Sequence, residues 1–475
     1  MGKPLTLTLM LGVVLTSGCT MAPTYERPVL PVDDAWPTSN AYPDRPALQE
    51  AELVSWQAFF KSPILSRLIQ DSLANNRDLR VAVLNVEKTR AQYQIQWADL
   101  VPSIEAVGSL SRKGTPQNVN DGGTVRSTYT ATVGITSYEL DLFGRVRSLT
   151  ENALETYFAT REAQRAAHIS LIAQVAQGYV DYLAQKKILY AVGIILEAQE
   201  NAFKLVEARV SQGSASMADL ESARGDIENA RATVAQITTQ LAQSVNALSL
   251  LVGKPLKESD LGSEDLDDGL VQEVLPVNLP SKVLLARPDV MQAEHTLRAA
   301  GANIGAARAA FFPTISLTGT AGFSSAELSS LFSSGSRLAW TLAPQINLPI
   351  FEGGRTVAGL EVAEADQKIA VADYEKAVQS AFQEVADNLA GVKGGKARDD
   401  AQKKRLAAYM RAYEIAKSRY AHGVASFTDV LVLQQTLLNA SVEYVTGRVS
   451  YLKSLVTLYK ALGGGLDKEE APDKG

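Results

Sequence analysis

The sequence has few of the residues from which covalent, metal or catalytic clusters are built. Its 475 residues include one cysteine and three histidines, and the histidines lie far apart in the chain. A single cysteine excludes an intrachain disulfide and a Cys-x-x-Cys metal site. Ser-His, Cys-His and paired-acid constellations are not evident, and no glycine-containing segment fits a phosphate-binding or dinucleotide-binding pattern. We therefore expect a protein that is not an enzyme and that carries no metal and no cofactor.

An excess of positive charge and long apolar runs are also missing. The formal net charge is −6, opposite in sign to the basic surface of a nucleic-acid-binding domain. After residue 19, no run of about 18 consecutive apolar residues occurs, so no transmembrane helix is expected. The chain is 46% apolar and 21% charged, a balance typical of folded domains, which excludes a wholly disordered chain.

The first residues have the pattern of an exported lipoprotein. Lys3 is followed by an apolar stretch, Leu5 to Leu15, which is too short to span a bilayer. Small residues then precede Cys19. We expect residues 1–18 to be a lipoprotein signal peptide and Cys19 to be the lipid-attachment residue; an ordinary signal peptide with an incidental cysteine is the alternative. Thr20 stands where an aspartate would retain the protein in the inner membrane, so an outer-membrane location remains open.

Residues 19–62 are rich in proline and contain several aromatic residues. Proline fixes φ and removes a hydrogen-bond donor, so this segment is expected to be an extended arm. The aromatic side chains favour an arm that lies on the folded body. A loose tether is the alternative.

The rest of the chain is a tandem repeat. The motif Arg209-x₃-Gly213-x₂-Ser216-x₂-Asp219 recurs 210 residues later as Arg419, Gly423, Ser426 and Asp429. Two further blocks, Asp78 to Ile104 and Leu140 to Phe143, recur in the same order at nearly the same offset. Three blocks in one order predict two copies of one unit, residues 63–270 and 271–466, followed by a charged tail at 467–475.

Each copy has the same predicted elements. Each begins with a helix that ends before a proline, at about 64–100 and 286–312, and continues with two strands. The strands alternate weakly with period 2, as transmembrane barrel strands do, and a small soluble sheet is the alternative. The strands are predicted at about 102–112, 127–141, 313–323 and 337–350.

A long helix and a returning helix complete each copy. The long helices are predicted at about 147–210 and 356–422, and three glycines at 391, 394 and 395 predict a break or bulge in the second. The returning helices have apolar residues at alternating spacings of three and four, which is a coiled-coil pattern. Each copy should therefore contain a coiled-coil hairpin, with tips at about 211–216 and 421–426.

These elements limit how the chain can cross a membrane. Open sheet edges cannot face lipid, so spanning strands must close into a barrel, and four strands are too few to do so. A barrel would be shared between subunits, with eight strands from two copies or twelve from three. The predicted fold class is mostly α, with a membrane β-barrel portion.

At this point the sequence resembles outer-membrane efflux channels of the TolC type, within the lipoprotein branch that serves resistance-nodulation-division drug pumps. The resemblance covers nearly the whole mature chain. It rests on Cys19 with Met21 to Pro28, Trp56-x₂-Phe59-Phe60, Tyr138 to Arg145, Arg287-Pro-Asp289, Gly305 to Pro313, Leu348 to Gly354 and Ala461 to Gly465. It implies a homotrimer with a twelve-stranded β-barrel continued by a periplasmic α-barrel, whose closed end opens when an adaptor protein and an inner-membrane transporter dock.

The resemblance also implies roles for residues at the tips. Asp429 matches an acidic ring at the periplasmic aperture, and Tyr420 and Asp219 match a hydrogen-bonded pair that helps to keep the aperture shut. Gly213, Ser216, Gly423 and Ser426 match the surface that adaptor hairpins contact. Where the family often has a second acidic residue and a basic latch residue, this chain has Val432 and Ala425. A purely structural role is the alternative, because glycine suits the turn, serine caps the next helix, and aspartate suits its first turn.

The predicted function is a passive exit duct for drugs and other small molecules in a tripartite efflux pump. Its predicted location is the outer membrane of a Gram-negative bacterium, with a lipid anchor and an extension into the periplasm. The predicted partners are two further copies of the chain, a periplasmic membrane-fusion adaptor, an inner-membrane resistance-nodulation-division transporter and outer-membrane lipid, without nucleic acid. The alternatives are the channel of a type I protein secretion system and a periplasmic coiled-coil scaffold or adaptor lipoprotein.

Overall fold

The computed structural model describes residues 20–42, 55–114, 125–273, 281–333, 336–422 and 424–464. The predicted signal peptide, Cys19, Gly423 and the charged tail at 467–475 lie outside these residues. The chain divides into two compact units. The first contains residues 1–29, 84–161 and 292–376, and the second contains residues 30–83, 162–291 and 377–475.

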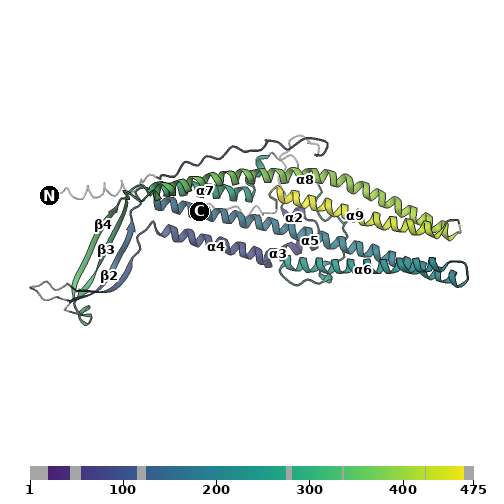
Figure 1. Ribbon diagram of the computed structural model, residues 1–475, viewed down its shortest axis with the longest axis horizontal. Helices are drawn as coiled ribbons and strands as arrows, with labels where there is room; N and C mark the ends of the chain where they lie inside the picture. Colours follow the sequence, from purple (N-terminus) through teal and green to yellow (C-terminus); the bar gives the residue numbers. More distant parts are fainter. Residues whose placement is uncertain are drawn as a thin grey trace, which may run out of the picture. The chain divides into compact units, whose positions relative to one another are not determined.

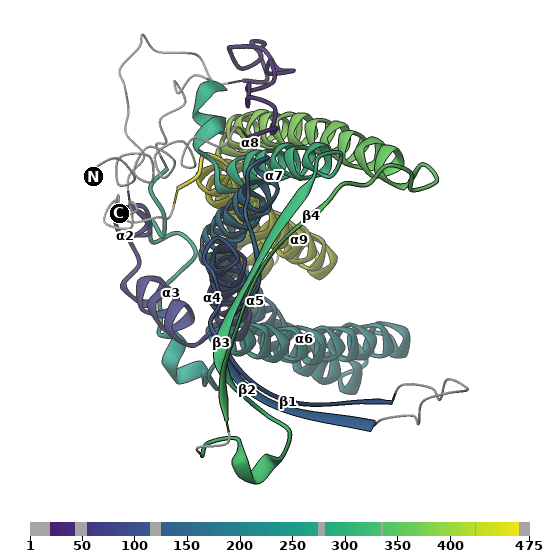
Figure 2. The same cartoon turned by 90° about the vertical axis from the view of Figure 1, so that its left-hand side faces the viewer.

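The first unit contains an antiparallel sheet. Within the described residues, four strands pair in the order β1-β2-β3-β4 (Figure 2). They are β1 (Glu105–Gly114), β2 (Val125–Glu139), β3 (Thr314–Ser325) and β4 (Arg337–Asn347), and a short 3₁₀ helix, η3 (Leu328–Ser330), lies between β3 and β4. The register shifts between Ile135 and Tyr138, where β2 contains a bulge. The β2–β3 pair joins the two repeats, because each repeat supplies two neighbouring strands.

One face of the sheet is apolar. Residues directly opposite one another on paired strands share a face, so the register settles which side chains lie together. Val133 pairs with Ala321, which pairs in turn with Trp340. Continuing this register gives an apolar face made of Ala106, Leu110, Tyr129, Ala131, Val133, Ile135, Ile315, Leu317, Ala321, Phe323, Leu338, Trp340, Leu342 and Ile346. Trp340 and Leu338 on β4 are each 73% exposed in the single chain, so this face is uncovered there.

The helix predicted over about 64–100 is interrupted. Two helices, α3 (Pro63–Asn75) and α4 (Arg77–Ala98), meet at Asn76. The Asn76 carboxamide accepts a hydrogen bond from the Leu79 backbone N–H at 2.9 Å and donates one to the Leu251 carbonyl at 2.8 Å. Asparagine is a favoured N-cap residue, so a second helix begins after Asn76. The apolar periodicity alone had predicted a single continuous helix. The matching helix of the second repeat, α7 (Pro288–Ala309), is continuous.

Two long hairpins follow the strand pairs. The first joins α5 (Arg145–Ser211) to α6 (Met217–Val252), and the second joins α8 (Arg355–Ala421) to α9 (Phe427–Ala461); the helices of each hairpin lie side by side (Figure 1). Helix α8 continues through Gly391, Gly394 and Gly395, so the predicted break was wrong. A Cβ atom at Gly391 or Gly395 would lie 3.3 Å from the Ser454 side chain or 3.2 Å from the Tyr451 side chain, both on α9. Two of these glycines therefore allow close approach of α9 and leave the helix intact.

The second unit has an aromatic core near the end of α9. A short helix, α2 (Trp56–Phe59), places Phe59 against Tyr459, with ring centroids 4.1 Å apart and an interplanar angle of 4°. Both side chains are buried. Residues that connect the two repeats lie beside α2, because the Gln272 N–H donates to the Phe59 carbonyl at 2.9 Å and Phe60 forms a β-bridge with Val271. Two 3₁₀ helices, η1 (Glu258–Leu261) and η2 (Ser281–Ala286), belong to the same connection.

The described part of the N-terminal arm is held by side-chain contacts. In the first unit, Glu294 on α7 accepts hydrogen bonds from the Tyr25 hydroxyl and from the Arg27 guanidinium, each at 2.9 Å. In the second unit, Trp36 is buried and stacks on Phe382 of α8 with ring centroids 4.9 Å apart. The aromatic residues of the arm are therefore used for packing, as the interpretation of a body-bound arm requires.

Glu294 is expected to hold the arm in a pH-dependent way. Burial alone would raise the pKa of Glu294, but hydrogen bonds from Arg27, Tyr25 and Arg298 outweigh it and lower this pKa from its ordinary 4.5. A carboxyl group whose pKa is lowered by folding stabilises the fold above its ordinary pKa, and this contribution is lost as the pH falls through the lowered value. The change Glu294→Gln should remove about 1–3 kcal/mol of arm binding at neutral pH.

Proteinase K digestion of the purified protein measures this effect. Cleavage within residues 20–29 should be faster in Glu294→Gln at pH 7, and the difference should shrink as the pH falls through the lowered pKa of Glu294. Glu26→Gln, which changes an exposed neighbouring carboxylate on the arm, serves as the control. Equal cleavage rates in Glu294→Gln and wild type at pH 7 would contradict the assignment.

Candidate functional site

The tip of the first hairpin is a glycine turn. Gly213 has φ +71°, a backbone conformation that favours glycine, and its N–H donates to the Val210 carbonyl at 2.9 Å. The Ser214 N–H donates to the Arg209 carbonyl at 2.8 Å. This bonding pattern satisfies the last carbonyls of α5 and reverses the chain. At the second tip, the Val424 N–H donates to the Arg419 carbonyl at 3.0 Å, the bond equivalent to that of Ser214.

Each returning helix begins with a capping box. Ser216 accepts a hydrogen bond from the Asp219 N–H at 3.1 Å, and the Asp219 carboxylate accepts one from the Ser216 N–H at 3.0 Å. Ser426 and Asp429 do the same at 3.1 and 3.0 Å. Hydrogen bonds from serine lower the pKa of both Asp219 and Asp429. Both tips therefore carry an exposed, ionised carboxylate that is fixed in position by its own helix start.

The structure brings Tyr420 to the other hairpin through an arginine. The Arg209 guanidinium carbon lies 5.5 Å from the centroid of the Tyr420 ring, within cation–π distance. The described bonds of Asp219 are those to Ser216 in its own hairpin. The hydrogen bond between Tyr420 and Asp219 therefore stays a prediction. Arg209 was not foreseen as a contact between hairpins, although its place in the repeated motif was a signal that the tip uses it.

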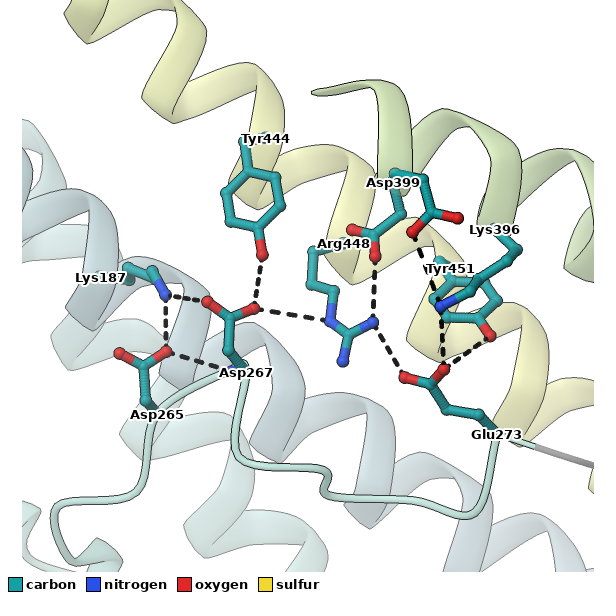
Figure 3. Close-up of polar contacts among 10 residues, drawn as sticks. Lys187, Asp265, Asp267, Glu273, Lys396, Asp399, Tyr444, Arg448 and Tyr451 are labelled. Atoms are coloured by element: carbon teal, nitrogen blue, oxygen red, sulfur yellow. Dashed lines mark hydrogen bonds and ion pairs between the residues drawn. The ribbon is translucent and has the colours of Figure 1, made fainter. Parts of the chain in front are cut away.

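A second polar site, absent from the sequence-based expectations, surrounds Arg448 on α9 (Figure 3). We call residues 265–273, where the first repeat ends and the second begins, the linker. One Arg448 nitrogen, Nη1, lies 3.1 Å from both Glu273 of the linker and Asp399 of α8. The Arg448 Nε lies 3.7 Å from Asp267, also in the linker. Arg448 thus joins the linker to both helices of the second hairpin.

Further groups surround the linker carboxylates. Lys187 of α5 lies 2.6 Å from Asp265 and from Asp267, and Lys396 of α8 lies 3.2 Å from Glu273 (Figure 3). The Tyr444 and Tyr451 hydroxyls of α9 donate to Asp267 at 2.6 Å and to Glu273 at 3.4 Å. We call this group of residues the Arg448 cluster.

The carboxylates of the Arg448 cluster divide into two kinds. Burial alone would raise the pKa of Asp267 and Glu273, but hydrogen bonds from Lys187 and Lys396, with the charge of Arg448, lower both pKa values. Burial raises the pKa of Asp399, and Arg448 offsets this only in part. The linker carboxylates are therefore well matched to their cations, while Asp399 is the more deeply desolvated partner.

Among the described residues, no group of three or more histidine, cysteine, aspartate and glutamate side chains is arranged to hold a metal ion. No helix in this described part of the chain combines the length and apolar composition needed to cross a membrane.

The comparisons with known proteins agree over nearly the full chain. The outer membrane efflux protein family matches residues 68–254 and 279–464. The chain belongs to this family. A probable efflux pump outer membrane protein, TtgC of Pseudomonas putida, is 44% identical over 462 residues, covering 97% of this chain and 95% of its own.

Solved structures show the same fold. A membrane protein from Pseudomonas aeruginosa superposes with a TM-score of 0.86 at 39% identity and covers 94% of this chain and all of its own. The open state of the Neisseria gonorrhoeae MtrE outer membrane channel gives a TM-score of 0.84 at 39% identity, covering 95% of this chain and 99% of its own. The predicted family, fold class, outer-membrane location and efflux role are confirmed.

Proposed function

We propose that this chain is the passive exit duct of a tripartite multidrug efflux pump and that it acts as a homotrimer. The observation that carries the proposal is the sheet, with one apolar face that is uncovered in the single chain and two outer strands that each pair on one side in the described structure. The relatives named as efflux pump outer membrane proteins support the pump role.

The sheet needs partner strands. In lipid, each backbone N–H and C=O group must find a partner, so β1 and β4 cannot remain as open edges. Pairing β4 of one copy with β1 of the next is a head-to-tail contact, which is stable as a ring when the rotation closes. Four strands per copy give twelve strands in a trimer, with Trp340 and its apolar neighbours facing lipid and the opposite face, which includes Thr130, Thr132 and Thr320, turned inward.

Two exposed helix stripes in the first unit fit the same ring. On α8, Val362 and Ile369 are exposed beside Ala358, Ala365 and Ala372. On α4, Leu84 and Ile95 are exposed beside Ala91 and Ala98. The α8 positions recur at three- and four-residue spacing, and those of α4 at spacings of seven, four and three with Lys88 between Leu84 and Ala91, so each set lies along one side of its helix. We assign the α8 stripe of one copy to the α4 stripe of its neighbour.

The tips are proposed as the periplasmic entrance. Asp429 would contribute one carboxylate per subunit to an acidic ring, and Tyr420 and Asp219 would lie beside it. Gly213, Ser216, Gly423 and Ser426 would form the surface that a periplasmic adaptor contacts, and an inner-membrane resistance-nodulation-division transporter would supply the energy. Cys19, outside the described residues, is proposed as the lipid-attachment residue.

The two alternative functions are less well supported. A channel for protein secretion would share the fold, but the relatives named above are efflux proteins. A periplasmic scaffold would leave the exposed apolar face of the sheet, which includes Trp340 on the outer strand β4, without a role.

Drug accumulation tests the proposal directly. Cells that lack this gene should accumulate more dye and antibiotic than wild-type cells, and a plasmid copy should restore the lower level. Unchanged accumulation, together with altered protein content of the medium, would favour the secretion role.

The α8 stripe predicts a defect in assembly. The change Ile369→Lys should abolish the heat-stable trimer that we expect in SDS gels of outer-membrane fractions, because a lysine at a subunit contact must be desolvated without a partner. Ile369→Leu, which keeps the stripe apolar, should retain the trimer. Normal trimer yield in Ile369→Lys would argue against this interface.

Asp429 predicts a specific change in permeation. The change Asp429→Asn keeps an acceptor for the capping box and removes the charge, so it should relieve block by multivalent cations in single-channel recordings from planar bilayers. Glu228→Gln removes an exposed charge further along the first hairpin, away from the tip, and should leave cation block unchanged. Identical records from Asp429→Asn and wild type would remove Asp429 from the aperture.

A further inference from the structure

The second hairpin is attached to its surroundings in two different ways. Near the end of α9, Tyr459 stacks on Phe59 in the aromatic core, and the Arg287 guanidinium donates to the Ala461 carbonyl at 2.5 Å. All three side chains are buried, and water cannot replace the stack. This end of the hairpin is fixed.

Further along α9, toward the tip, the attachment is polar. Between Tyr444 and Tyr451, the hairpin meets the linker through the Arg448 cluster, in which hydrogen bonds and ion pairs reach Asp267 and Glu273 (Figure 3). The linker itself stays anchored to α2 by the β-bridge between Phe60 and Val271. It can therefore remain in place while the hairpin moves.

A groove lies directly beside the cluster on the side of the tip. It has a volume of about 380 Å³ and is lined by residues of α5, α8 and α9, including Ile194, Met410 and Leu437. Lys187 and Tyr444, both members of the Arg448 cluster, form part of its lining. Beyond the cluster, α5 and the second hairpin therefore face a hollow, and close packing does not hold them together there.

The ion pairs of the cluster are arranged so that the hairpin can separate from the linker without leaving a buried charge unpaired. Arg448 and Asp399, whose side chains are 8% and 6% exposed, belong to α9 and α8 and would stay paired inside the hairpin. Lys396 of α8 has Asp400 as a neighbour at 3.7 Å. On the linker side, Asp267 and Glu273 are about one third exposed, and Asp267 keeps Lys187. An uncompensated buried charge, the usual obstacle to breaking such contacts, does not arise.

We propose that the Arg448 cluster is an ionic latch between the linker and the second hairpin, and that the Phe59–Tyr459 stack is the pivot about which this hairpin swings when the latch opens. The latch favours the position in which Tyr420 lies against Arg209, and its release favours a wider entrance. This inference rests on the proposed function, because it concerns the opening of that channel.

Variants of the linker test the latch without leaving a buried charge unpaired. The full-length trimer carrying Glu273→Gln should show an open probability in planar bilayers about two- to fivefold above wild type, as expected for a partly exposed ion pair. Cells carrying it should become more sensitive to a large glycopeptide antibiotic that an intact outer membrane excludes. Glu200→Gln removes the exposed pair with Arg231 on the first hairpin and is the matched control, with wild-type behaviour expected.

A second variant covers the case in which Glu273→Gln does not assemble. Lys396→Met removes the half-exposed cation that contacts Glu273, and should raise the open probability in the same direction. Open probabilities equal to wild type in the assembled variants would overturn the latch, as would an equal rise in Glu200→Gln. These results are distinguishable from failure of the proposed function, in which the wild-type protein itself would form no channel.

Discussion

The central physical constraint on this protein is that backbone hydrogen-bonding groups cannot remain unpaired in lipid. A sheet of four strands with an apolar face has two open edges, which cannot face lipid. The described residues of the chain supply no further strands to cover these edges. Assembly is then part of folding. The exposed apolar stripes on α4 and α8 belong to the same requirement, since both lie in the unit that carries the sheet.

Much of this architecture could be predicted because its determinants are local or periodic. The residues that form the turn at Gly213 and the capping box of Ser216 and Asp219 lie close together in the sequence, and the same residue types recur 210 positions later. The strands alternate along their own length, so their ends were placed to within a few residues. The break at Asn76 was missed because one cap residue there outweighs an otherwise continuous helical pattern. The glycines of α8 led to the wrong prediction of a break, because two of them allow contact with α9. The sequence of α8 alone does not reveal that contact.

The Arg448 cluster could not be predicted from the sequence, for a different reason. Arg448 and Glu273 are separated by 175 residues, and Asp399 reaches the same guanidinium from a third segment. None of the cluster residues belongs to the motif that repeats, so the comparison of the two halves did not point to them. Their joint position depends on packing of the linker against α2 and α9, a tertiary result of many small contacts.

The two tips share the residues that build the turn, and this has a consequence for recognition. Glycine, serine and aspartate occupy equivalent positions in both, with the same hydrogen bonds where they are described. A partner that binds the tips, as proposed for the adaptor, therefore cannot distinguish one tip from the other through them. Discrimination must come from equivalent positions where the copies differ: Gln212 and His422, Ser214 and Val424, Met217 and Phe427, Glu221 and Leu431. The residues that form the turn are the same in both tips, so the neighbouring positions can differ in sequence, and with them the partner that each tip binds, without loss of the turn.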